Sequence, residues 1–95
     1  MKEITIKKAV YKQLEKEGYY GWSAPKVRYI ETDIFGIFDG LFIKDSHIRY
    51  IQWTTVSNMS ARKNKILKFF EEHKCWIPCE IYGMREDGTF KIIQL

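Results

Sequence analysis

The sequence predicts a small α/β domain in which one mixed sheet is flanked by two helices. Ninety-five residues suit one domain with one core, and no repeat or linker divides them. Two segments repeat apolar residues at helical spacing. The remaining segments are short apolar or alternating runs bounded by turn residues, which is typical of strands. The resulting order is αβββαββ, and residues 1–95 are expected to form a single domain.

Residues 2–17 and about 60–73 are predicted to be helices. Gly18 is a good stop signal for the first helix, and residues 57–60 offer capping side chains for the second. The apolar positions are Ile6, Ala9, Val10 and Leu14 in the first helix and Ile66, Leu67, Phe69 and Phe70 in the second.

Five strands are predicted between and after these helices. They cover residues 19–22, 36–44, 47–56, 76–84 and 90–95, and residues 26–31 are read as a continuation of the first strand after a kink. Pro78 favours an edge position or a bulge for the fourth strand, because proline cannot donate to the ladder.

A polar pair stands inside the second and third strands. Asp45-Ser46 fits a two-residue hairpin loop. With Lys44 opposite His47, the register places Asp39 opposite Gln52, and Thr54 follows on the same face. A carboxylate and an amide in half-buried strands are costly unless something binds them. The pattern therefore indicates either a site or an unusual polar core.

The composition restricts the class of protein. Lys and Arg outnumber Asp and Glu by 16 to 12, and a net charge of +4 permits an anionic partner without requiring one. No apolar run approaches the roughly 20 residues of a membrane span, and no apolar signal region precedes the first charges. We therefore expect a cytoplasmic, intracellular protein with no membrane partner. Cys75 and Cys79 do not match zinc-finger spacing, and we expect both to be reduced and mostly buried.

The predicted order, with Asp39 on the second strand and a Gln52-x-Thr54 pair on the third, resembles the PD-(D/E)XK nucleases and their restriction-endonuclease-like fold. The chain is most similar to small Holliday-junction-resolvase-like and phage-type nucleases. The segment Asp33-Ile34-Phe35-Gly36-Ile37-Phe38-Asp39 also resembles the lead-in of the smaller members. The resemblance covers most of the chain from Ala9 onward. It implies an endonuclease that uses Mg²⁺ or Mn²⁺ on duplex or branched DNA, and it implies a homodimer.

The resemblance also assigns roles to individual residues. Asp39 matches the metal-bridging aspartate, Gln52 stands where glutamate is usual, and Thr54 stands where lysine is usual. The glutamine brings a carbonyl oxygen without negative charge, so we expect Mg²⁺ to bind weakly without DNA. Asp33 is a candidate second metal ligand, and Lys65 is the candidate for a lysine relocated to the second helix.

One further ligand of the family is not found at its expected place. Lys7 falls where resolvases carry a glutamate on the first helix.

Basic residues on both helices are candidates for binding phosphates. They are Arg62, Lys63, Lys65 and Lys68 on the second helix and Lys8 and Lys12 on the first.

Other interpretations remain open at this point. Asp39, Gln52 and Thr54 could be structural, and the lysines of the first helix could form a solvated face. We expect Trp22, Trp53 and Trp76 to lie in the core rather than to stack on bases. The rival functions are a catalytically inactive DNA-binding relative and a small homodimeric interaction module.

Overall fold

A computed structural model describes residues 2–24 and 33–95, which form two helices and five strands. The predicted element order is confirmed, and the residues 26–31 that we read as a strand continuation lie outside the described part of the chain. Neither helix in the described part is long and apolar enough to cross a membrane. The elements are α1 (Glu3–Lys16), β1 (Tyr20–Ser23), β2 (Gly40–Lys44), β3 (His47–Thr55), α2 (Met59–His73), β4 (Cys79–Met84) and β5 (Phe90–Gln94), with a 3-10 turn at Val56–Asn58 before α2.

The strands form one mixed sheet in the order β1-β2-β3-β4-β5. Strands β1, β2 and β3 make an antiparallel meander, and α2 then returns the chain so that β4 pairs parallel to β3. Strand β5 pairs antiparallel to β4 at the far edge. The hairpin between β2 and β3 has the predicted register, with Lys44 opposite His47 and Asp45 in the left-handed conformation that tight hairpin turns require.

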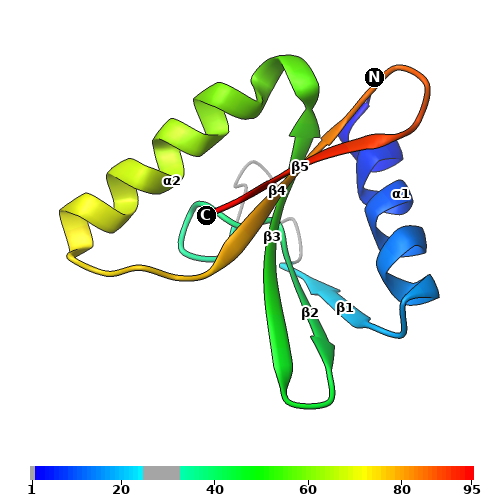
Figure 1. The fold of residues 1–95 in the computed structure, drawn as a ribbon, viewed down its shortest axis with the longest axis horizontal. Helices are drawn as coiled ribbons and strands as arrows, with labels where there is room; N and C mark the ends of the chain where they lie inside the picture. Colours follow the sequence, from blue (N-terminus) through cyan, green and yellow to red (C-terminus); the bar gives the residue numbers. More distant parts are fainter. Residues whose placement is uncertain (1, 25–32) are drawn as a thin grey trace.

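The two helices cover opposite faces of the sheet (Figure 1). The buried side of α1 consists of Ile6, Val10 and Leu14, and it packs in one cluster with residues of β2, β3 and β4. The buried side of α2 consists of Met59, Ile66 and Phe70, and it packs in a second cluster with Ile81 of β4 and the turn residues before β2. The core is therefore divided into two layers by the sheet.

A close contact seats the start of α2 on the sheet. A Cβ atom added at Gly83 would lie 2.1 Å from the sulfur of Met59, so the Met59 side chain would have to move to admit any larger residue at this position of β4. On the opposite face, Arg49 forms a two-pronged ion pair with Glu80, at 2.7 and 2.6 Å, which ties β3 to β4.

Several sequence expectations about where strands begin and which side chains are buried are wrong. Strand β2 begins at Gly40 and not at Gly36, because residues 34–38 close a tight turn in which the Phe38 N–H donates to the Ile34 carbonyl. Strand β4 begins at Cys79, directly after Pro78, and it lies between β3 and β5, so the edge position that Pro78 suggested is wrong. Cys75 precedes this strand and is exposed, not buried on it. Of the three tryptophans, only Trp53 is buried, whereas Trp22 and Trp76 are exposed.

Candidate functional site

The side chains of Asp39 and Gln52 are hydrogen-bonded to each other across neighbouring segments. Asp39 lies one residue before β2, and its N–H donates to the Ile51 carbonyl at 2.9 Å, which continues the ladder by one residue. The Gln52 Nε2 donates to Asp39 Oδ2 at 2.6 Å, and the Trp53 N–H donates to the same oxygen at 2.8 Å. The pairing that the hairpin register predicted is therefore confirmed, although Asp39 precedes the strand.

This pair lines a cavity of about 180 Å³ at the open edge of β3, beyond the start of β2. Both helices begin at this end of the sheet, where β3 ends (Figure 1). Helix N-termini favour anionic groups, since their first N–H groups lack intrahelical partners. The cavity is lined by Glu3, Ile6, Asp33, Asp39, Gln52, Trp53, Thr54, Thr55, Asn58 and Arg62.

The electrostatics of the cavity are dominated by the Asp39 carboxylate. Burial raises the pKa of Asp39 to about 7, because the charged form loses its hydration. The hydrogen bond from the Trp53 N–H lowers this pKa, the carboxylates of Asp33 and Glu3 raise it by repulsion, and the Arg62 guanidinium lowers it. At neutral pH the group therefore exchanges readily between its neutral and charged forms.

The structure brings together four of the side chains that the sequence suggested for the catalytic and metal site, and it adds Arg62. Asp33, Asp39, Gln52 and Thr54 all line the cavity. Lys65, which we took as the candidate relocated lysine, does not line it, whereas Arg62, one helical turn earlier, does. Lys65 and Lys68 are exposed, and Lys63 is half-buried on the same helix.

Glu3 is a residue of this cavity that the sequence reasoning missed. Lys7, which falls where the family places its first-helix glutamate, is not part of the cavity lining. Glu3 lies three residues before Ile6 and seven before Val10, so helical spacing puts it on the edge of the buried face. The helical spacing could have indicated that Glu3 faces the sheet, but it does not tell which end of the helix lies near the residues of the cavity.

The donor set consists of oxygen atoms. Asp39, Asp33 and Glu3 carry carboxylates. Gln52 donates to Asp39 through its amide nitrogen, so its carbonyl oxygen is not used in that hydrogen bond. Among the described residues, however, no group of three or more His, Cys, Asp and Glu side chains is placed so that it could hold a metal ion. The cavity could thus supply only some of the six oxygens that Mg²⁺ requires.

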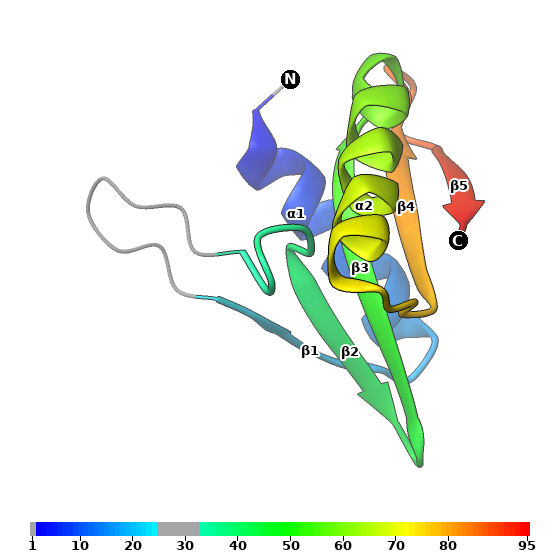
Figure 2. The ribbon, with the colours of Figure 1, turned by 90° about the vertical axis from the view of Figure 1, so that its left-hand side faces the viewer.

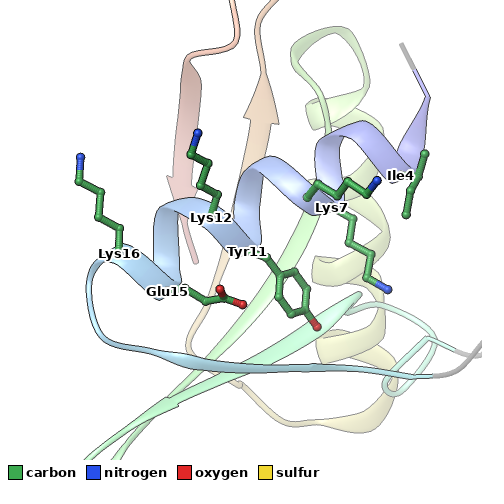
Figure 3. Close-up of a pocket in the computed structure, with 7 residues that line it drawn as sticks. Ile4, Lys7, Tyr11, Lys12, Glu15 and Lys16 are labelled. Carbon is green, nitrogen blue, oxygen red and sulfur yellow. The ribbon is translucent and has the colours of Figure 1, made fainter.

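The predicted phosphate-binding lysines of α1 line a separate hollow of about 680 Å³ on the outer side of that helix. Figure 3 shows Lys7, Lys12 and Lys16 projecting from α1 around Tyr11, and Lys8 is part of the same lining. The negative charge of Glu15 lies among them. The structure thus gathers these lysines on one helix and separates them from the residues that line the Asp39 cavity.

No protein-family model matches this chain, and a search of the curated proteins returns no match. The functional interpretation therefore depends on the geometry of the site and on the resemblance described above.

The raised pKa of Asp39 makes a prediction about stability. The folded state retains a proton on Asp39 between about pH 4 and pH 7 that the unfolded chain releases, because the pKa is about 7 when folded and near 3.8 otherwise. This contribution is complete below about pH 4 and is lost as the pH rises through 7. Asp39→Asn keeps an oxygen that can accept both hydrogen bonds, and it should stabilise the protein at pH 8 by about 2–4 kcal/mol.

The measurement is urea unfolding of both proteins at pH 5 and pH 8, with a chelator present. The advantage of the Asn variant should be much smaller at pH 5, and comparing the two proteins cancels all other titrating groups. An equal difference at both pH values would contradict the raised pKa.

Proposed function

We propose that this chain is a metal-dependent DNA endonuclease of the PD-(D/E)XK type. The observation that carries the proposal is the hydrogen-bonded Asp39–Gln52 pair, which shares one cavity with two further carboxylates and a guanidinium. The architecture is compatible with it, because a helix, a three-strand meander, a second helix and a further strand follow in the order on which the resemblance rests.

The oxygen donors of the cavity fit a weak Mg²⁺ or Mn²⁺ site. Asp39, Asp33 and Gln52 are the ligands that we propose. The mutual repulsion of the carboxylates, which helps to raise the pKa of Asp39, is what a divalent cation would relieve. Because no complete protein cage is present among the described residues, phosphate oxygens and water must supply the remaining ligands. The bound ion would activate the attacking water and neutralise charge on the phosphate.

Arg62 supplies the cavity with a positive charge, which the resemblance would place on a lysine at the position of Thr54. Thr54 offers only a neutral hydroxyl at the usual lysine position, while Arg62 reaches the same cavity from the second turn of α2. A guanidinium binds phosphate oxygens through two parallel hydrogen bonds, so Arg62 can anchor the phosphate that enters the cavity.

The exposed basic side of α2 is the proposed duplex surface. Lys65 and Lys68 continue from Arg62 along this helix, and both are exposed. Lys68 is 3.8 Å from Glu72, but an exposed pair of this kind is weak, so its charge stays accessible to DNA.

One observation favours a second candidate function. The cavity has a neutral glutamine and threonine where the resemblance implies glutamate and lysine, so its charge is low for catalysis. A catalytically inactive DNA-binding relative would keep Arg62 and the α2 surface while losing cleavage. Divalent-metal dependence separates the two proposals.

Cleavage is expected to be slow, to be faster with Mn²⁺ than with Mg²⁺, and to stop in EDTA. Asp39→Ala should abolish it, because it removes the carboxylate that β3 holds in the cavity. Gln52→Glu should tighten Mn²⁺ binding by at least about tenfold, since one added negative charge near a divalent cation is worth more than about 1 kcal/mol even in water. The measurement is cleavage of plasmid, linear duplex and four-way-junction DNA, together with calorimetric titration of Mn²⁺.

Asp87→Ala is the matched control, because this carboxylate lies in the turn before β5, is not part of the cavity lining, and should leave cleavage unchanged. Cleavage that survives Asp39→Ala would place the activity elsewhere. Binding of DNA without cleavage under either metal would favour the inactive relative.

The second prediction from this proposal concerns DNA affinity. Replacing both Arg62 and Lys65 with alanine should weaken binding and reduce the slope of log K against log salt by roughly one to two units, because about one ion is released per phosphate contact. Lys44→Ala, beside the hairpin turn, removes a charge at the end of β2 that lies away from the cavity and should leave the slope unchanged. Equal slopes for the wild type and the double variant would remove α2 from the DNA surface.

A further inference from the structure

One face of the β1–β2–β3 meander is apolar, and four of its six side chains are exposed in the described part of the chain. The register aligns Tyr20 with Ile43 and Ile48 in one row across the strands, and Trp22 with Leu41 and Tyr50 in the next. The intervening Phe42 belongs to the cluster under α1, so these six side chains point to the opposite face, as alternation along a strand requires. We call this surface the apolar sheet face; its residues are Tyr20, Trp22, Leu41, Ile43, Ile48 and Tyr50.

The exposure of these side chains is high for apolar residues. Tyr20 is 71% exposed, Trp22 49%, Ile43 47% and Ile48 58%. Helix α2 lies on this side of the sheet, but its buried residues pack on β4 and on the turn before β2. Figure 2 shows β1 beside β2 and the hairpin of β2 and β3 extending beyond the end of α2. Tyr50 is half-buried against Phe38 and the cluster under α2, and Leu41 is also half-buried. The other four side chains of the face are not covered by either described helix.

The exposed part of this surface is large enough for an interaction site. With about 150–250 Å² for a fully accessible aromatic side chain, the four most exposed residues leave about 400 Å² of apolar surface. The largest apolar patch of a monomer commonly has this size, roughly 300–600 Å², and is often functional. This area is also about half of the roughly 800 Å² that each partner buries in a standard interface, which suits an apolar centre with a polar rim.

We propose that the apolar sheet face is the surface through which two copies of this chain associate as a symmetric dimer. A twofold interface brings the same patch of both copies together, so the patch must complement itself. An uncharged apolar face meets this condition. DNA would require cations to neutralise its phosphates, and none of the six residues carries one. The proposal does not rest on the proposed nuclease activity.

The test is sedimentation equilibrium of the whole protein from about 1 μM to about 1 mM. The wild type should dimerise, and Ile48→Asp should weaken the dimer at least about 30-fold, because it places a charge within the apolar interface. Ile92→Asp is the matched control: Ile92 is 49% exposed on β5, at the other edge of the sheet, and its variant should dimerise like the wild type.

Circular dichroism checks that each variant is folded, and Tyr20→Lys, at the most exposed position of the face, gives an independent second variant. A wild type that stays monomeric over the whole range would overturn the proposal. It would also fail if folded Ile48→Asp and Tyr20→Lys dimerise as tightly as the wild type. A Trp22→Ala variant that loses single-strand DNA binding in a monomeric protein would instead identify a base-stacking surface.

Discussion

The two hydrogen bonds that Asp39 accepts hold together the end of the sheet at which both helices begin. The ladder between β2 and β3 ends with Gly40 opposite Ile51, so the next residues of β3 pair with β4 on one side but have no strand on the side of β2. The Asp39 side chain takes the place of that strand, because its Oδ2 accepts from the Trp53 N–H and from Gln52 Nε2. A buried N–H without a partner would cost free energy comparable to a lost hydrogen bond. The cavity exists because a side chain, and not backbone, closes the sheet here.

Closing the sheet with the Asp39 side chain instead of a strand places a carboxylate where its negative charge is unfavourable. The carboxylate that stabilises the end of β3 is desolvated and faces two other carboxylates, which raises its pKa to about 7, and Arg62 offsets only part of this. A purely structural role would be served equally well by asparagine, which accepts the same bonds without charge. A carboxylate kept at the cost of stability is typical of functional sites. We therefore interpret this unfavourable charge as the signature of a site that is completed by a cation or by substrate.

The hairpin register was predictable because a two-residue loop fixes the pairing of every residue beyond it, and this gave Asp39 opposite Gln52. The start of β2 was not predictable, since the apolar residues 34–38 fit a strand pattern while the left-handed Phe35 and Gly36 turn the chain back on itself. Glu3 and Arg62 were harder to assign to the cavity, because their positions depend on how two helices pack on the sheet. The exposure of Trp22 was missed because aromatic content predicts burial but not which face of the sheet a helix leaves uncovered.

The most direct test of this account is a carboxyl ¹³C NMR titration of Asp39, assigned by comparison with Asp39→Asn. In metal-free buffer the resonance should titrate with a pKa of about 7. Saturating Mn²⁺ would broaden it, and saturating Mg²⁺ with a non-cleavable DNA should lower the pKa, because the cation favours the charged form. A metal-free pKa near the ordinary value of 3.8 would contradict the buried, repelled carboxylate on which the site depends.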